Sequence, residues 1–130
     1  MSVSVGDRAE RSVVVDDERL EQFAAATGDR NPIHFDDAYA AQTRFGGRIA
    51  HGLLVGGIIS ALLANDLPGP GTVYLSQELR FRAPVRPGDS VRCEVEVTAI
   101  DDRGRATLAT RAWVGETLVV DGEARVLLPS

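Results

Sequence analysis

The chain contains no lysine: all fourteen of its basic residues are arginines, set against nineteen Asp and Glu residues for a net charge of −5. The absence of lysine excludes covalent catalysis through a Schiff base on a lysine side chain. The surplus of acidic residues argues against a general nucleic-acid-binding protein, which needs a surplus of basic charge to meet phosphates. We therefore expect no nucleic-acid partner.

Cysteine and histidine are also scarce. Cys93 is the single cysteine, so an internal disulfide and a zinc or iron–sulfur site with several cysteines are excluded. His34 and His51 are the two histidines, and without supporting cysteines they match none of the usual zinc spacings. We expect no metal and no bound cofactor, and we expect Cys93 to be an inert core residue.

Long hydrophobic segments are missing as well. Residues 1–15 hold no apolar run of signal-peptide length before their charges begin. The longest nearly uncharged run, residues 49–65, is too short for a comfortable membrane span. The 130 residues, 44% of them hydrophobic, are the size of one domain and suffice for a core. We predict a single cytoplasmic domain over residues 1–130, without a membrane partner.

The first half of the chain has the pattern of helices. An amphipathic helix is expected between Asp16, a good N-cap, and Gly28, which suits the position just after a helix. Residues 51–65 are apolar on every side, which is typical of a helix that is buried all round. The other expected elements are an edge strand at residues 11–15 and a short helix from Asp36 or Asp37 to Ala41.

The second half has the pattern of strands. Apolar and polar residues alternate between residues 73 and 126 in about four segments. Turn-forming sequences separate these segments at residues 84–89, 101–104 and 115–116. One buried helix against one curved antiparallel sheet makes a two-layer α+β domain. We predict the hot-dog fold, in which the sheet wraps around the central helix.

The segment FAAATGDRNPIH, residues 23–34, carries the clearest chemical signal. It places the carboxylate of Asp29 and the imidazole of His34 five residues apart, on a predicted loop because Pro32 cannot lie in a helix interior. Such a pair can share a water, take a proton from it and return one, which is general acid–base catalysis. An isolated Asp–His pair is more often structural, but the stiff turn at Asn31 and the neighbouring apolar helix favour catalysis.

Gly52, at the start of the apolar helix, is a second candidate. The first amides of a helix have no intrahelical acceptor and lie at the positive end of its dipole. A free N–H at Gly52 can therefore hold a carbonyl oxygen that becomes an enolate oxygen. Taken alone, the pattern favours a structural explanation, in which His51 caps the helix and Gly52 eases a tight entry.

Together, the motif F-x3-T-G-D-x-N-P-I-H and the sequence AHGLL that follows it resemble the MaoC-like hot-dog hydratases, above all the (R)-specific enoyl-CoA hydratases that supply polyhydroxyalkanoate synthesis. The similarity continues through LPGPGTVYLSQELRFRAPVRPGDSV and GEARVLLP. It implies that Asp29 and His34 bind and activate water and that the Gly52 amide polarises a thioester carbonyl. The implied reaction is reversible syn addition of water to trans-2-enoyl-CoA, giving (3R)-3-hydroxyacyl-CoA.

The resemblance also implies contacts with the acyl chain. Ser60 and Leu63 match positions that shape the acyl pocket, on the exposed side of the central helix, and we expect Asn31 to contact substrate as well. Gly56 and Ser60 share one helix face with Gly52. This face either forms a shallow groove for the acyl chain or lets the sheet or a partner's helix approach closely.

Several arginines bear on the bound substrate. Arg125 occupies a position in the last strand where the family often has a small apolar residue that lines the acyl pocket. This difference bears on the acyl chain length that the protein accepts. Arg80, Arg82 and Arg86 cluster around a strand end and a turn. They could contact CoA phosphates, although such a cluster is more often a solvated face. The resemblance further implies a homodimer that holds the CoA group of an acyl-CoA substrate along the subunit boundary.

Three alternatives to a hydratase stay open at the level of sequence. A 3-hydroxyacyl-ACP or 3-hydroxyacyl-CoA dehydratase of fatty-acid or polyketide assembly would use the same groups in the reverse direction. A hot-dog thioesterase needs a carboxylate that directs water at the thioester carbonyl, which the GDRNPIH segment does not favour. A non-catalytic acyl-CoA-binding domain should lack the acid–base pair, so Asp29 and His34 count against it.

Overall fold

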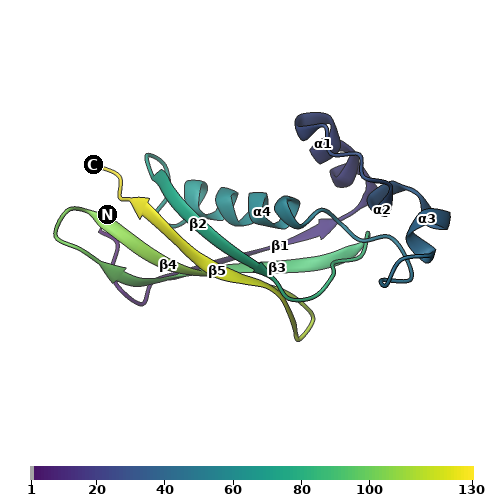
Figure 1. Ribbon diagram of the computed structural model, residues 1–130. Coiled ribbons are helices and arrows are strands. Elements are labelled where there is room, and N and C mark those ends of the chain that lie inside the picture. Colours follow the sequence, from purple (N-terminus) through teal and green to yellow (C-terminus); the bar gives the residue numbers. More distant parts are fainter. Residues whose placement is uncertain (1) are drawn as a thin grey trace.

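The structure, a computed structural model, describes residues 2–130 as one curved sheet and four helices. In chain order the elements are β1 (Arg8–Val15), α1 (Asp17–Thr27), α2 (Pro32–Phe35), α3 (Asp37–Ala41), α4 (Gly52–Asn65), β2 (Val73–Phe81), β3 (Asp89–Ile100), β4 (Arg105–Val114) and β5 (Thr117–Leu127). All strand pairs are antiparallel in the order β1-β3-β4-β5-β2, so β1 and β2 form the edges. The sheet curves along α4, and α1–α3 lie beyond its N-terminal end (Figure 1). The predicted α+β hot-dog fold is confirmed.

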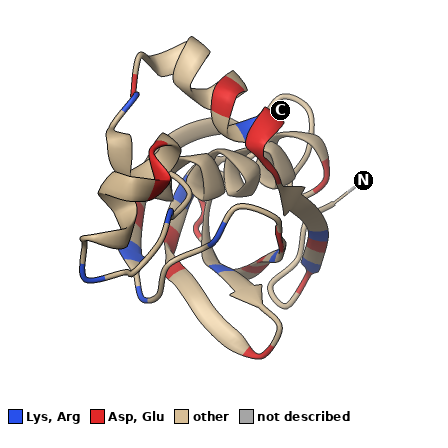
Figure 2. Ribbon diagram, turned by 90° about the vertical axis from the view of Figure 1, so that its right-hand side faces the viewer, with Lys and Arg blue, Asp and Glu red and all other residues tan. Residues whose placement is uncertain are grey.

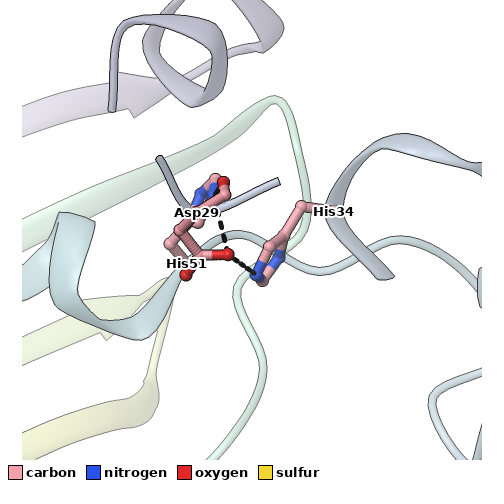
Figure 3. Close-up of side chains that lie close together, drawn as sticks. All are labelled: Asp29, His34 and His51. Carbon is pink, nitrogen blue, oxygen red and sulfur yellow. Dashed lines mark hydrogen bonds and ion pairs between the residues drawn. The ribbon is translucent and has the colours of Figure 1, made fainter. Parts of the chain in front are cut away.

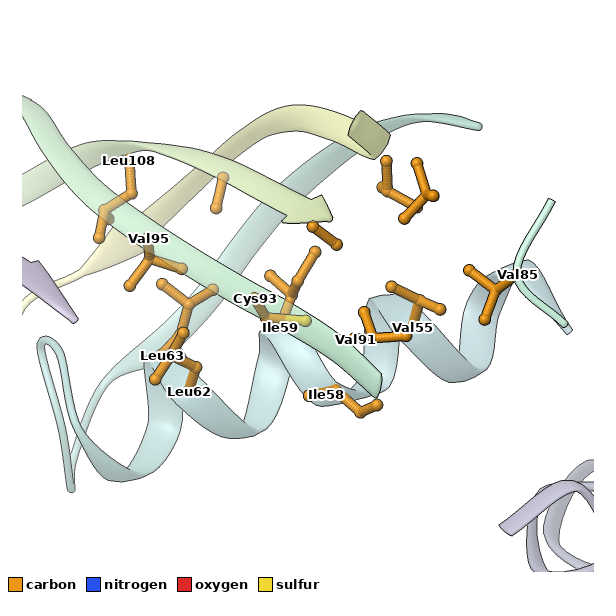
Figure 4. Close-up of a cluster of buried hydrophobic side chains, with 14 of the residues drawn as sticks. Val55, Ile58, Ile59, Leu62, Leu63, Val85, Val91, Cys93, Val95 and Leu108 are labelled. Carbon is orange, nitrogen blue, oxygen red and sulfur yellow. The ribbon is translucent and has the colours of Figure 1, made fainter. Parts of the chain in front are cut away.

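The core lies between α4 and the inner face of the sheet (Figure 4). The buried side chains of α4 are Val55, Ile58, Ile59, Leu62 and Leu63, and they pack with Val91, Cys93, Val95 and Leu108 of β3 and β4. Removing a large apolar side chain from water stabilises the fold by about 1.5–3 kcal/mol. Burial also raises the pKa of the Cys93 thiol to about 11. The prediction that Cys93 lies in the core is confirmed, and its inertness stays a prediction.

The expectation that the central helix is buried all round is wrong for the chain by itself. Leu53 of α4 is 62% exposed, and Gly57 is also exposed. On edge strand β2, Leu75 and Phe81 are 50% and 55% exposed. The reason is that the sheet covers one side of α4, while no other element of residues 2–130 covers the opposite side. Figure 2 shows α4 in tan, free of charged residues.

The expected position of Leu63 is also wrong. Leu63 is 2% exposed and belongs to the core cluster, because it lies four residues after Ile59 and therefore on the helix face that meets the sheet. Ser60 is half-buried on the adjoining face, and its contact with the acyl chain stays a prediction. Within residues 2–130, no helix has the length and apolarity needed to cross a membrane.

The helices before the site begin and end as the sequence predicts, with one exception. Helix α1 is capped by Asp16, whose carboxylate accepts from the Arg19 N–H at 3.0 Å, and it ends at Gly28 with φ 82°. The exception is the predicted loop around Pro32, which contains the one-turn helix α2. Proline is accepted there because the first helical residue needs no amide hydrogen, and Asn31 caps the turn by accepting from the Ile33 N–H.

Gly122 is required where β5 pairs with β2. A Cβ added at this glycine would lie 1.8 Å from the carbonyl oxygen of Glu78. We expect Gly122→Ala to lower the free energy of unfolding by about 3 kcal/mol or more, because backbone rather than a flexible side chain must move. Urea unfolding measures this loss. The control is Glu123→Ala, at an exposed neighbouring position of β5, which should change stability by no more than about 0.5 kcal/mol. Equal stability of the two variants would contradict the expected clash.

Candidate active site

A cleft of about 530 Å³ opens at the N-terminal end of α4. Its walls come from α1, the segment before α2, the segment before α4 and the end of β2. The three predicted catalytic residues, Asp29, His34 and Gly52, all line it, so the fold brings them to one place. The size is within the range of small-molecule sites. Figure 3 shows Asp29 and His34 together with a residue that was not expected to take part, His51.

The ring of His34 is oriented by a backbone carbonyl. Its Nδ1 lies 2.7 Å from the carbonyl oxygen of Ile49. A carbonyl can only accept a hydrogen bond, so Nδ1 carries a hydrogen and the other ring nitrogen, Nε2, holds the lone pair of the neutral ring. Nε2 lies 3.9 Å from Oδ1 of Asp29. The proton-exchanging atom of His34 therefore faces the carboxylate, while the ring itself is buried.

Asp29 is held from its backbone and stays open to the cleft. Its N–H donates to Oγ1 of Thr27, and its Oδ1 accepts from the Asn31 N–H, each at 3.2 Å. The side chain is 45% exposed. This carboxylate can thus reach both His34 and a substrate that enters the cleft.

His51 connects the carboxylate loop to α4. Its Nε2 donates to the carbonyl oxygen of Asp29 at 3.0 Å, and its ring lies 3.8 Å from that of His34 at an angle of 30°. His51 occupies the N-cap position of α4, but its side chain makes no hydrogen bond that caps the helix, so a capping role for the imidazole is wrong. Sequence reasoning missed the true contact because it joins residues that lie 22 positions apart. The one available signal was the place of His51 directly before Gly52.

The environment of His51 disfavours the charged form of its ring. Burial lowers the pKa of His51 most, and the nearby His34 lowers it further, while the hydrogen bond to Asp29 and its charge raise it. The Nε2 hydrogen of His51 donates to a carbonyl, so this nitrogen offers no lone pair to a metal. Among the three side chains, only Asp29 and His34 direct lone pairs toward one another. The three groups lie within 4.8 Å of one another, but this proton arrangement suits acid–base chemistry better than a three-ligand metal centre. The absence of a metal stays a prediction.

The small residues of α4 make room for β2. A Cβ on Gly52 would lie 2.6 Å from the ring of Phe81, and one on Gly56 would lie 2.9 Å from Leu79. Gly52 and Gly56 therefore allow side chains of β2 to approach α4 closely. Gly56 and Ser60, farther along α4, also line a hollow between α4 and β2. This hollow shares Phe81 with the catalytic cleft.

Two further predicted substrate contacts differ from expectation. The side chain of Asn31 caps α2 and does not line the cleft, so its contact with substrate stays a prediction. Arg125 lies exposed on the outer face of β5, whereas its neighbour Ala124 is the buried residue on the inner face. Since alternate residues of a strand point to opposite faces, the side chain of Arg125 points away from α4.

The arginine cluster has mainly structural contacts. Arg86 donates to the carbonyl oxygens of Phe45 and Gly47 at 2.6 and 3.0 Å, so it supports the segment before α4. Arg82 forms an ion pair with Asp121, although it also lines the cleft. Arg80 pairs with Glu78 at 2.8 Å. Of the three, Arg82 is placed to meet a substrate.

Comparisons with known proteins identify the family to which the chain belongs. The MaoC like domain matches residues 4–119. The chain is 58% identical over 108 residues to a 3-hydroxybutyryl-CoA dehydratase of Methylorubrum extorquens, covering 82% of this chain and 69% of that protein. It is 46% identical over 130 residues to an (R)-specific enoyl-CoA hydratase of Aeromonas caviae, covering 98% and 97%. The chain belongs to the MaoC-like family.

A solved structure extends the similarity to three dimensions. The (R)-hydratase of A. caviae involved in PHA biosynthesis superposes on this MaoC-like chain with a TM-score of 0.95 at 46% identity, covering 98% of each chain. The matched family region contains Asp29, His34, His51 and Gly52. The family suspected from the sequence motifs is thus confirmed.

The lowered pKa of His51 predicts how the stability of this MaoC-like chain depends on pH. The unfolded state takes up a proton on His51 near pH 6.5, while the folded state takes it up at a lower pH. The contribution of neutral His51 to stability is therefore complete above about pH 6.5 and is lost as pH falls toward the folded pKa. Urea unfolding at pH 7.5 and 5.5 should show wild type losing more stability than His51→Gln. Equal losses, measured at one protein concentration, would contradict a neutral His51.

Proposed function

We propose that the chain is an (R)-specific enoyl-CoA hydratase, which adds water reversibly and with syn geometry to trans-2-enoyl-CoA to give (3R)-3-hydroxyacyl-CoA. The observation that carries this proposal is the pairing of the Asp29 carboxylate with Nε2 of His34, 3.9 Å apart, in a cleft that also contains Gly52 at a helix N-terminus. The hydratases and dehydratases among the relatives are hydro-lyases, and this site has the groups that such a reaction needs.

The Asp29–His34 pair handles the protons. A separation of 3.9 Å is too long for a direct hydrogen bond and suits a water bonded to both groups. The water oxygen attacks C3 of the enoyl group and gives one proton to the pair, and the pair gives one proton to C2. Net addition is therefore one water, and both new bonds form on the face of the alkene that the pair occupies. This arrangement accounts for syn addition.

Gly52 stabilises the charge that develops on the thioester. As water attacks C3, the electron pair of the alkene moves toward C2 and the carbonyl oxygen. The Gly52 N–H, first in α4, has no intrahelical acceptor and lies at the positive end of the helix dipole. An amide so placed can hold the enolate oxygen. The CoA thioester is substrate, and we propose that no cofactor or metal takes part.

The dehydratase is the second candidate, because the same groups serve both directions of one reaction. A specific observation supports it: the 58% identical relative is named a 3-hydroxybutyryl-CoA dehydratase. Retention of the protein on an acyl-carrier-protein column would favour a carrier-bound substrate over a CoA thioester. A thioesterase would release free thiol from crotonyl-CoA, and a binding domain would leave it unchanged. A cytoplasmic location and a role in polyhydroxyalkanoate or fatty-acid metabolism remain part of this proposal.

Loss of either member of the catalytic pair should remove most activity. We expect Asp29→Asn and His34→Ala each to lower hydration of crotonyl-CoA by about 10²–10⁴-fold, the usual contribution of a general acid–base group. Loss of enoyl absorbance measures the rate, and chiral analysis identifies the product. Asp102→Asn, in the turn between β3 and β4, is the matched control and should keep wild-type turnover. Near wild-type turnover of Asp29→Asn would reject the assignment.

A homodimer is the oligomeric state that we propose. The apolar side of α4 and the inner face of edge strand β2 expose Leu53, Leu75 and Phe81 to water, and β2 has unpaired backbone groups on its outer edge. Pairing with a second copy would cover both features. Sedimentation equilibrium should give about twice the 13.9 kDa chain mass. A stable and active monomer would contradict the dimer.

Ser60 is proposed to meet the acyl tail in the hollow beside α4. Ser60→Leu should leave crotonyl-CoA turnover nearly unchanged and lower activity progressively on longer chains, since one methylene in a pocket is worth about 1–3 kcal/mol. Rates on a C4 to C12 enoyl-CoA series, together with thermal unfolding, test this. If the face is packed instead, the added bulk costs about 1–3 kcal/mol of stability and lowers activity on every chain length alike. That result would reject the role of Ser60.

A further inference from the structure

His51 is the one buried titratable group of the cleft that the proposed reaction does not use. Its side chain is 1% exposed and lies between the two catalytic side chains and aromatic rings. Nε2 donates to the Asp29 carbonyl, and the ring lies 3.8 Å from the ring of His34. On its other sides the ring meets Phe23 of α1 at 4.8 Å and Phe35 of α2 at 5.7 Å. It therefore contacts both residues of the proposed catalytic pair, while almost none of its own side chain is exposed to solvent.

We propose that His51 is a positioning residue: its Nε2–H fixes the backbone at Asp29 and its ring fixes the plane of His34, so that the carboxylate and Nε2 of His34 keep the separation needed for a shared water. The inference rests on the proposed hydratase function and adds a residue that acts through the catalytic pair. Because His51 immediately precedes Gly52, the same side chain also fixes the pair relative to the amide that holds the thioester carbonyl.

The hydrogen-bonding state of His51 distinguishes positioning from simple packing. Its Nδ1 is the one buried side-chain nitrogen or oxygen in residues 2–130 without a hydrogen-bond partner. An apolar side chain of similar volume would fill this space without leaving an unpaired polar atom, and such an atom ordinarily costs stability. An imidazole at this position is thus less favourable for stability than an apolar side chain, but its Nε2–H supplies a hydrogen-bond donor. The contact with the Asp29 carbonyl is the interaction that accounts for it.

The two histidines accordingly hold their hydrogens on opposite nitrogens. His34 carries its hydrogen on Nδ1, toward Ile49, and His51 carries its hydrogen on Nε2, toward Asp29. The ionisable groups that face His51 are Asp29, from the segment before α2, and His34, from α2; the α1 and α2 rings that complete its surroundings are phenylalanines. A charged His51 beside His34 would oppose protonation of the catalytic ring. A neutral His51 leaves His34 as the ring that exchanges protons.

The test compares three variants. Gln carries an amide nitrogen at about the reach of Nε2, Asn carries one at about the reach of Nδ1, and Leu carries none. We expect His51→Gln to keep kcat on crotonyl-CoA within about threefold of wild type. His51→Asn and His51→Leu should lower kcat by about 10- to 100-fold with little change in KM, the size expected when a supporting contact to a catalytic group is lost. Both Asn and Gln bury an amide, so a difference between the two variants reports the position of the donor nitrogen and not the cost of burying a polar group.

A second readout does not depend on activity. The chain has only two histidines, so long-range ¹H–¹⁵N spectra of wild type and the His51 variants assign both rings directly. We expect the Nε2–H form for His51 and the Nδ1–H form for neutral His34 in wild type. In His51→Asn the His34 signals should broaden or split, because the ring plane is no longer fixed, whereas in His51→Gln they should stay sharp.

Each outcome decides the proposal. Equal kcat for folded His51→Gln and His51→Asn, or an Nδ1–H form of His51 in wild type, would overturn it. If His51→Leu fails to fold, the Gln and Asn pair and the wild-type spectra still decide. If wild type itself does not hydrate crotonyl-CoA, the proposed function fails, while the spectra still test whether His51 holds Asp29 and His34 in place.

Discussion

Packing of one face of α4 on β3 and β4 determines where every catalytic group lies. The buried aliphatic side chains of that face fix the rotation of the helix and its position along the sheet. The same packing places the N-terminal residues His51 and Gly52 at the end of the sheet, where α2 and its preceding segment arrive. Two backbone hydrogen bonds join these parts: the Ile49 N–H donates to the Ile33 carbonyl, and the Ala50 N–H donates to Val85. The hydrophobic core thus positions the helix end, and hydrogen bonds position the catalytic loop on it.

Two backbone carbonyls determine which nitrogen of each histidine carries the hydrogen. Ile49 accepts from Nδ1 of His34, and Asp29 accepts from Nε2 of His51. Neither carbonyl can titrate, so each ring keeps its hydrogen on the assigned nitrogen over the pH range in which the ring is neutral. The carboxylate of Asp29 is the one anionic group within reach of both rings. Burial lowers the pKa of His51 and so disfavours its charged form beside this carboxylate.

Local patterns in the sequence predicted most elements and the proximity of Asp29 and His34, because these depend on short-range chemistry. The cap at Asp16, the left-handed Gly28 and the alternation in the strands act within a few residues. The features that the sequence does not predict depend on which face of a helix or strand packs against its neighbour. Leu63 was placed on the exposed side, since an all-apolar helix has no polar stripe to mark its orientation. His51 was given a capping role because its partner, the Asp29 carbonyl, is a backbone group that no side-chain pattern marks. Arg125 differs from expectation because a shift of one residue along a strand exchanges its inner and outer faces.

The exposed apolar strip beside Gly52 connects the proposed assembly to the chemistry. Phe81 packs against Gly52 and is still 55% exposed in the single chain. Water near this ring would weaken the attraction between the Gly52 amide and a developing enolate oxygen, since electrostatic interactions fall as the local dielectric rises. A second copy that covered Phe81 and Leu53 would remove this water and strengthen the same amide. The glycine is fixed by packing within one chain, but its electrostatic effect depends on what covers the neighbouring ring. Burying this strip would therefore contribute both to assembly and to stabilisation of the transition state. The exposure of Phe81 beside the Gly52 amide thus supports a site that is completed when two copies associate.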